Sequence, residues 1–143
     1  MTTAITGSCC CEAVQYRITS DITMAVNCHC NRGKKAGGGA FSSIAVVREK
    51  HLEFTSGEER LTTYQLGDNV AKHFCSLCGT SIFNRNRRYP GRCMVALGSL
   101  DNPAAIVPSV NIHCENQLRW VILDGKMENF EQDYSRSDEN TSN

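Results

Sequence analysis

The stretch FCSLCGTSIF, residues 74–83, contains the feature that decides the fold, a cysteine pair formed by Cys75 and Cys78. Gly79 follows the pair, and an apolar run comes next. A Cys-x-x-Cys turn lets both thiolates face one point, and a following glycine permits the positive φ that such a knuckle often needs. The stretch therefore predicts half of a tetrahedral metal site in front of a strand.

The other half of this site is expected near the start of the chain, in GSCCCEAVQY, residues 7–16. Cys9 and Cys11 are separated by one residue, and alternate side chains of an extended backbone share a face. With Cys75 and Cys78 they provide four thiolates, which suit a closed structural zinc site. Buried apolar cysteines are the alternative. We favour zinc, which would join the start of the chain to its middle and contribute to folding.

The composition indicates a single domain in a reducing compartment. A chain of 143 residues suits one core, and its nine cysteines point to metal binding or catalysis where disulfides are disfavoured. The formal net charge is zero, so nucleic acid is not an expected partner. Neither a signal peptide nor an apolar run long enough to span a bilayer is recognisable. We therefore expect a cytoplasmic location and no membrane partner.

The apolar residues recur mostly with period two, which predicts an all-β domain of short strands over residues 1–130. Helical character is expected only over residues 101–106, and the polar residues 131–143 are expected to form a disordered tail. The expected strands cover residues 13–18, 41–47, 52–54, 61–66, 80–83, 93–97, 110–114 and 120–123.

A second Cys-x-Cys pair lies in NCHCNRGKKAGGGAF, residues 27–41. Cys28 and Cys30 offer two thiolates, whereas a catalytic zinc keeps three protein ligands and one open position. The natural third place is Gly33, which cannot ligate, and His29 is expected to point away from the pair. The sequence therefore predicts an incomplete second metal site, with the two cysteines as candidate catalytic residues.

The residues that follow this pair form a candidate anion-binding loop. Lys34 and Lys35 stand close to Gly37 and Gly38, and cations with backbone amides can accept an anionic ligand. The alternative is a solvated flexible loop. A second candidate anion surface, with a solvated hairpin end as its alternative, is formed by Arg85, Arg87 and Arg88.

The order and spacing of the motifs resemble the glutathione-dependent formaldehyde-activating enzyme family, the CENP-V/GFA domain. The resemblance extends from Gly7 to about Phe130, and its motifs are GSCCCEAVQY, NCHCNRGKKAGGGAF, FTSGEERLTTY, FCSLCGTSIF, VALGSLDNP and an end that carries Trp120. It implies a Mss4-like β-tent fold. It also implies that one structural zinc is shared by Cys9, Cys11, Cys75 and Cys78.

The resemblance further implies a carbon–sulfur lyase that uses a thiol substrate. The family reaction is the reversible condensation of formaldehyde with glutathione to S-(hydroxymethyl)glutathione, in which a second zinc activates the glutathione thiolate. The family holds that zinc with Cys-His-Cys-x-x-Cys, of which Cys28 and Cys30 are present and Gly33 is a departure. The protein is therefore expected to be such a lyase with an incomplete second site. The alternative is a non-catalytic zinc-stapled binding module.

Other groups could complete the second site, and other chemistry could replace it. Glutathione could complete the coordination shell of the second zinc. Alternatively, nearby cations could lower the pKa of Cys28 or Cys30 and allow thiol chemistry without any metal. A zinc deaminase with H-x-E…P-C-x-x-C matches poorly at His51-Leu52-Glu53, because Phe74 stands where proline is needed. The side chains that could supply a further ligand are Cys93, Cys114, His29, His73 and His113.

Overall fold

The structure, a computed structural model, describes residues 4–134, so residues 135–143 of the expected tail lie outside the described residues. Residues 4–134 form two β-sheets and one short α-helix, which confirms the all-β prediction. None of the described helices is long and apolar enough to cross a bilayer. The elements are β1 (Ile5–Ser8), β2 (Gln15–Ile18), β3 (Ala25–Cys28), α1 (Asn31–Gly37), β4 (Ser42–Arg48), β5 (Leu52–Ser56), β6 (Leu61–Gln65), β7 (Val70–Cys75), β8 (Ser81–Asn86), β9 (Arg92–Ala96), β10 (Val110–Ile112) and β11 (Glu128–Asn129).

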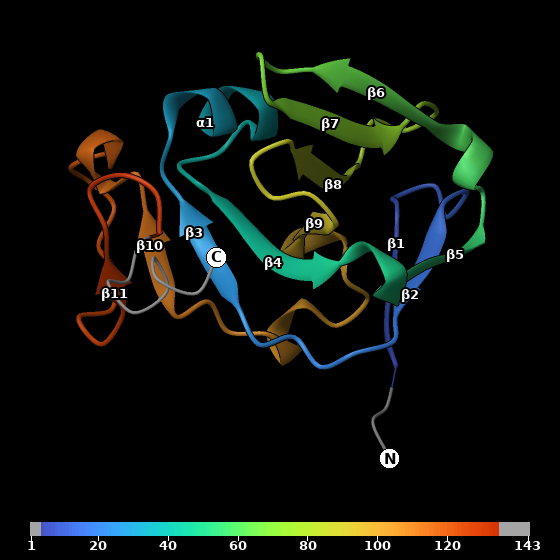
Figure 1. The fold of residues 1–143 in the computed structure, drawn as a ribbon, viewed down its shortest axis with the longest axis horizontal. Helices are drawn as coiled ribbons and strands as arrows, with labels where there is room; N and C mark the ends of the chain where they lie inside the picture. The colour runs from blue at the N-terminus through green and yellow to red at the C-terminus, as the bar shows by residue number, and fades with distance from the viewer. Residues whose placement is uncertain (1–3, 135–143) are drawn as a thin grey trace.

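The two sheets differ in size and in strand direction. The small sheet has the order β1-β2-β5 and is antiparallel throughout. The large sheet has the order β11-β10-β3-β4-β9-β8-β7-β6, and β10 runs parallel to both of its neighbours. Figure 1 shows the small sheet at one end of the long axis and β10 with β11 at the other end. The two cysteine motifs of the sequence therefore fall on different parts of the molecule.

The main core lies between the two sheets. Alternation along β2 buries Tyr16 and Ile18 and leaves Gln15 and Arg17 exposed, as the period-two pattern predicts. The Tyr16 hydroxyl forms a 2.6 Å hydrogen bond with the Ser99 hydroxyl inside this core. From the large sheet the core receives Ala45, Val47, Ile82, Phe83, Cys93 and Val95. Burial of these side chains against the small sheet holds the two layers together.

Close packing at β1 explains why residue 7 is a glycine. A Cβ at Gly7 would lie 2.1 Å from the Tyr16 ring, which no side chain could tolerate. The backbone of β1 therefore passes directly over the buried ring of its neighbouring strand, and only glycine allows this approach. The turn after β1, which carries Cys9, is thereby held next to the core.

The structure contradicts two of the secondary-structure predictions. No strand forms over residues 120–123, and Trp120 is 72% exposed, so this apolar run has no sheet to join. The expected glycine-rich loop is helical over Asn31–Gly37, where α1 is closed by Gly38 at φ 76°. The helical character expected over residues 101–106 reduces to one 3-10 turn at Pro103–Ala105.

Candidate metal and thiol sites

Four cysteines far apart in the sequence meet where the two sheets adjoin, and we call them the four-cysteine cluster. Cys9 and Cys11 come from the turn between β1 and β2, while Cys75 ends β7 and Cys78 lies in the turn before β8. All four sulfur atoms lie within 4.8 Å of one another. The Sγ–Sγ distance is 3.6 Å between Cys9 and Cys11 and 3.8 Å between Cys11 and Cys75. The cluster could hold a metal ion.

The turn that carries Cys75 and Cys78 has the expected knuckle form. Gly79 adopts φ 80°, and its amide donates to the Cys75 carbonyl at 2.9 Å. The Cys75 amide in turn donates to the Thr80 carbonyl at 2.9 Å, which starts the ladder between β7 and β8. The positive φ predicted for this glycine is therefore confirmed, and it is what turns the chain back toward Cys9 and Cys11.

Hydrogen-bond donors surround the sulfurs of the four-cysteine cluster. The Val14 amide donates to Cys9 Sγ at 3.3 Å, and the Leu77 amide donates to Cys75 Sγ at 3.4 Å. The Thr80 hydroxyl lies 3.2 Å from Cys78 Sγ and, with the Thr80 amide, lowers the pKa of that thiol to about 5. Donors of this kind favour the thiolate, which is the form that binds a metal.

The second pair, which we call the two-cysteine site, lies at the junction of β3 and α1. Cys28 ends β3, and Cys30 is the N-cap of α1, where its sulfur accepts a 3.2 Å hydrogen bond from the Gly33 amide. The Cys28 thiol donates to Cys30 Sγ at 3.4 Å. Both side chains are partly buried, and the two sulfurs meet where β3 ends and α1 begins.

This geometry gives the two sulfurs opposite acidities. The hydrogen bond from Cys28, followed by the Gly33 amide and the charges of His113 and Arg32, lowers the pKa of Cys30 to about 5. The same hydrogen bond, together with burial, raises the pKa of Cys28. The pair therefore shares one proton at neutral pH, with Cys28 as a thiol and Cys30 as a thiolate.

Position 33 faces the two-cysteine site, as its place in the motif suggests. A Cβ at Gly33 would lie 3.0 Å from Cys30 Sγ and 3.2 Å from Ser42 Oγ. A side chain there would therefore reach the sulfur pair, whereas glycine leaves only two thiols. The hydroxyl of Ser42 donates to the Gly33 carbonyl at 3.3 Å, and sequence reasoning had not singled out Ser42.

His29 lies behind the pair and not beside it. The ring is fully buried, its Nε2 is 3.1 Å from Asn111 Oδ1, and its ring centroid is 5.1 Å from that of Phe41. The Asn111 amide donates in turn to Asn129 Oδ1 at 2.9 Å. This buried network connects β3, β10 and β11, and it agrees with the expected orientation of His29. Its Nδ1 has no hydrogen-bond partner.

Some of the residues predicted to form the anion-binding loop make contacts with other parts of the protein. Lys34 Nζ donates to the Asn116 carbonyl and thereby ties α1 to the segment after β10. Lys35 is exposed, while Gly37 ends α1 and Gly38 caps it in the left-handed region. Lys35 is therefore the cation of this group that is presented to solvent near the two-cysteine site.

Among residues 4–134, no further protein ligand completes the two-cysteine site at short range. Within residues 4–134, the four-cysteine cluster is the only group of three or more Cys, His, Asp or Glu ligand atoms within 4.8 Å of one another. Cys93 is buried in β9 as expected, but Cys114 lies in a 3-10 turn and not on a strand. The deaminase arrangement does not form, because Glu53 pairs with Arg17 at 2.7 Å.

A segment that sequence reasoning had assigned partly to the tail contacts the two-cysteine site. Phe130 and Tyr134 pack with Cys28 around the apolar cluster at the end of β3 and β10. The His113 amide donates to the Gln132 carbonyl at 2.8 Å, and the Tyr89 hydroxyl donates to Asp133. The polar composition of this segment gave no signal for these contacts, because they depend on the pairing of β10 with β11.

The comparisons with known proteins agree with this geometry. The family model for the glutathione-dependent formaldehyde-activating enzyme matches residues 4–116. A Halomonas elongata protein that carries the family name is 28% identical over 127 residues, which cover 84% of this chain and 81% of that protein. A Podospora anserina protein of the same name is 28% identical over 82 residues, or 56% of this chain and 38% of its own length.

A solved structure shares the fold. A crystal structure of a Rhodobacter sphaeroides protein superposes with a TM-score of 0.58 at 26% identity, over 72% of this chain and 97% of that one. The family match spans both the four-cysteine cluster and the two-cysteine site. Because that match covers most of the sequence, the chain belongs to the glutathione-dependent formaldehyde-activating enzyme family.

Proposed function

We propose that the protein is a zinc-binding, carbon–sulfur lyase-like member of this family that acts in the cytoplasm on a glutathione-like thiol or its formaldehyde adduct. The observation that carries the proposal is the two-cysteine site, where one thiol and one thiolate face a third ligand position, Gly33, that has no side chain. A thiol substrate would bring its own sulfur in place of the ligand that Gly33 cannot supply.

The four-cysteine cluster is proposed to hold the structural zinc. A tetrahedral ion with Zn–S bonds of about 2.3 Å places its sulfurs about 3.8 Å apart. The distances of 3.6 Å and 3.8 Å in the cluster fit this spacing, and four thiolates are a donor set that zinc prefers. An ion there would connect the two sheets, because Cys9 and Cys11 follow the small sheet and Cys75 ends a strand of the large one.

At the two-cysteine site, Cys28 and Cys30 would hold a second zinc, which, when bound, lowers the pKa of a coordinated thiol and stabilises its thiolate. The reaction needs this thiolate. Its sulfur adds to the carbonyl carbon of formaldehyde, a carbon–sulfur bond forms, and the carbonyl electron pair moves to the oxygen, which takes up a proton. Cleavage of the adduct follows the same steps in reverse.

The cations of α1 are proposed to bind the charged ends of the substrate. Arg32 lies close enough to lower the pKa of Cys30 by its charge, and Lys35 is exposed one turn further along. Glutathione carries carboxylates, which these side chains and the backbone around Gly37 and Gly38 would attract. Lys34 would act indirectly, because its bond to Asn116 fixes the position of the helix.

The second candidate function is a zinc-stapled binding module without catalysis, and Gly33 is the observation that favours it. Two thiolates hold zinc more weakly than three, so the second ion is the part of the assembly most easily lost. The two functions differ in one property. The lyase needs a metal at the two-cysteine site, and the module needs only the ion of the four-cysteine cluster.

The test is the zinc content of protein purified without chelator, measured by elemental analysis with and without glutathione. S-Methylglutathione is the matched control, because it keeps the charges of glutathione and lacks the free thiol. A second zinc per chain that appears only with glutathione supports the lyase. One zinc under all conditions contradicts it and supports the binding module.

A further inference from the structure

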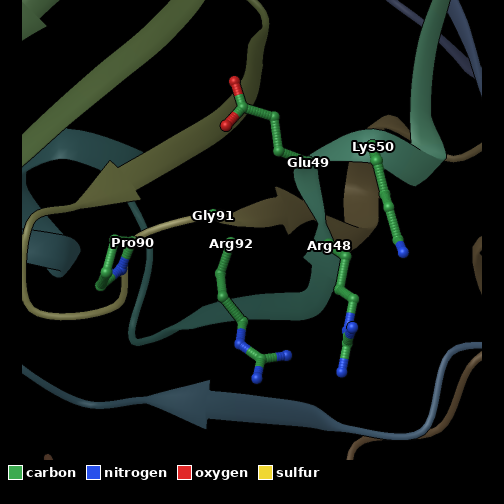
Figure 2. Close-up of a pocket in the computed structure, with 6 residues that line it drawn as sticks. All are labelled: Arg48, Glu49, Lys50, Pro90, Gly91 and Arg92. Atoms are coloured by element: carbon green, nitrogen blue, oxygen red, sulfur yellow. The ribbon is translucent and has the colours of Figure 1, made fainter.

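A group of cations lies where β4 ends and β9 begins. Arg48 and Arg92 are direct cross-strand partners, and Lys50 follows in the 3-10 turn after β4. All three are exposed. Figure 2 shows the side chains of Arg48 and Arg92 extending side by side in one direction. Their β-carbons are expected to be about 5 Å apart, as for directly opposed residues in antiparallel strands.

Within the described part of the chain, no carboxylate forms an ion pair with this group. The ion pairs within residues 4–134 are Arg17 with Glu53 and Arg85 with Glu49, so none includes the three cations. The side chain of Glu49 lies between them in sequence, but it is directed away from Arg48 and Arg92 in Figure 2 and pairs with Arg85 at 2.5 Å. Like charges directly opposite each other destabilise a sheet, so this arrangement lowers stability unless an anion is bound.

The cations line an open hollow together with residues of the turn before β9. The cavity of about 630 Å³ is lined by Arg48, Glu49, Lys50, Pro90, Gly91 and Arg92. The Glu49 amide donates to the Gly91 carbonyl at 2.8 Å, and Gly91 adopts φ 78°, so the turn after β4 is joined to the turn before β9. The hollow is therefore formed by connected elements and not by one mobile side chain.

We propose that this hollow, the Arg48–Arg92 site, binds a phosphate dianion, either free or as the phosphate group of a small phosphomonoester. Two guanidinium groups present planar forks that match phosphate oxygens, and Lys50 adds a point charge. A dianion with three cations compensates the repulsion between Arg48 and Arg92. The volume of the hollow exceeds that of a phosphate group, which leaves room for the rest of an ester.

The site is separate from the proposed lyase chemistry. Ser42 of β4 pairs with Cys28, and Arg48 is at the other end of the same strand. Six residues of extended chain span roughly 20 Å. It also differs from the anion surface predicted on the arginine-rich hairpin, since Arg85 of that group is already paired with Glu49.

The test is calorimetric titration of the full chain with inorganic phosphate, glucose 6-phosphate and, as the uncharged control, glucose. Arg48→Gln and Arg92→Gln are each expected to weaken phosphate binding about tenfold or more, because each removes a charged fork. Arg119→Gln removes an exposed charge elsewhere and should leave the affinity within about twofold. Thermal melting without phosphate checks that the variants fold. Phosphate should raise the melting temperature of the parent and of Arg119→Gln more than that of Arg48→Gln or Arg92→Gln.

The two sources of phosphate give different results. Tighter binding of glucose 6-phosphate than of inorganic phosphate assigns the site to a phosphomonoester, and equal binding assigns it to the free anion. The proposal is overturned if neither ligand binds at millimolar concentration. It is also overturned if folded Arg48→Gln and Arg92→Gln variants bind phosphate as the parent does.

Discussion

The four-cysteine cluster and the two-cysteine site both contain a Cys-x-Cys motif, but the two motifs meet different partners in the fold. Each has a Cys-x-Cys pair next to a strand of one sheet, following β1 in the cluster and at the end of β3 in the two-cysteine site. The pair of the cluster meets a second pair from the other sheet, whereas no second cysteine pair within residues 4–134 meets Cys28 and Cys30, and Gly33 stands beside Cys30. The difference teaches that the partner across the fold, and not the motif itself, decides how many sulfur ligands each site offers.

The protein contacts that hold the region around each site also differ. The region of the two-cysteine site is already held by protein contacts, because the buried network of His29, Asn111 and Asn129 connects β3, β10 and β11. The small sheet is held to the large sheet by the apolar core and, among the described residues, shares no strand ladder with it, and an isolated β-bridge joins its Gly7 to Leu100. An ion is therefore expected to matter for folding at the cluster and for reactivity at the two-cysteine site.

The largest expected effect comes from Cys75→Ser. Cys75 is fully buried, and structural zinc sites contribute about 10 kcal/mol or more of apparent binding free energy, which is comparable with the whole stability of a domain. We expect this variant to lose zinc and to unfold or aggregate, as measured by zinc content and circular dichroism melting. Cys28→Ser should remain folded, and Cys10→Ser is the exposed control. A Cys28→Ser variant that melted as low as Cys75→Ser would refute the division into two kinds of site.

Restoring the third thiol should convert the two-cysteine site into a metal site. Gly33→Cys places a side chain next to Cys30, so the variant should bind about one more zinc per chain than the parent. The Cys30 sulfur or the Ser42 hydroxyl must move by a few tenths of an ångström to admit it. Gly37→Cys is the matched control, since its Cβ would lie 3.7 Å from Ser42 Oγ and meets neither sulfur. An equal zinc content in both variants would contradict this reading of position 33.

The acidity of Cys30 gives a pH profile that separates it from ordinary thiols. Its pKa is lowered to about 5, so the thiolate persists as the pH falls from 8 to 6, whereas an ordinary thiol loses reactivity about tenfold per pH unit below its pKa. Alkylation of zinc-free protein by iodoacetamide, followed by peptide mass spectrometry, should show a nearly flat rate for Cys30 in this range. The rate for a short cysteine-containing peptide, used as the ordinary thiol, should fall over the same range. A parallel fall at Cys30 would show that the pair does not share a proton.

The smallest effect is expected from the network behind the pair. Asn111→Ala leaves the buried His29 ring without its bond to Oδ1, so the free energy of unfolding should fall by about 2 kcal/mol in urea. The zinc held by the four-cysteine cluster should stay unchanged, because no residue of the network belongs to that cluster. Asn129→Ala, at an exposed partner, should cost less than Asn111→Ala. A loss of zinc in Asn111→Ala would mean that the two regions are coupled.

Much of the fold and of the sites was predictable because the signals were local or chemical. The alternation of buried Tyr16 and Ile18 with polar neighbours gives β2 directly. The meeting of the two cysteine pairs follows from the ligand number of a metal, although Cys11 and Cys75 are 64 residues apart. The glycine knuckle after Cys78 follows from backbone sterics.

The remaining features depend on contacts that no local pattern reveals. Helix α1 contains two glycines, but it is fixed by the sulfur cap at Cys30 and by the bond from Lys34 to Asn116. The parallel pairing of β10 with β3 brings Asn111 to His29, and nothing near either residue in the sequence indicates this partner. The apolar run around Trp120 was assigned to a strand because periodicity does not say whether a neighbouring strand exists.

The long span between the halves of the four-cysteine cluster also concerns the order in which the protein folds. Joining Cys11 to Cys75 closes a loop of 64 residues, which costs roughly 4 kcal/mol of chain entropy before any core contact compensates it. That loop contains β3, α1 and the whole two-cysteine site. An ion that binds both cysteine pairs early would close this loop before the core forms. The same four sulfurs would then speed folding as well as stabilise the native state.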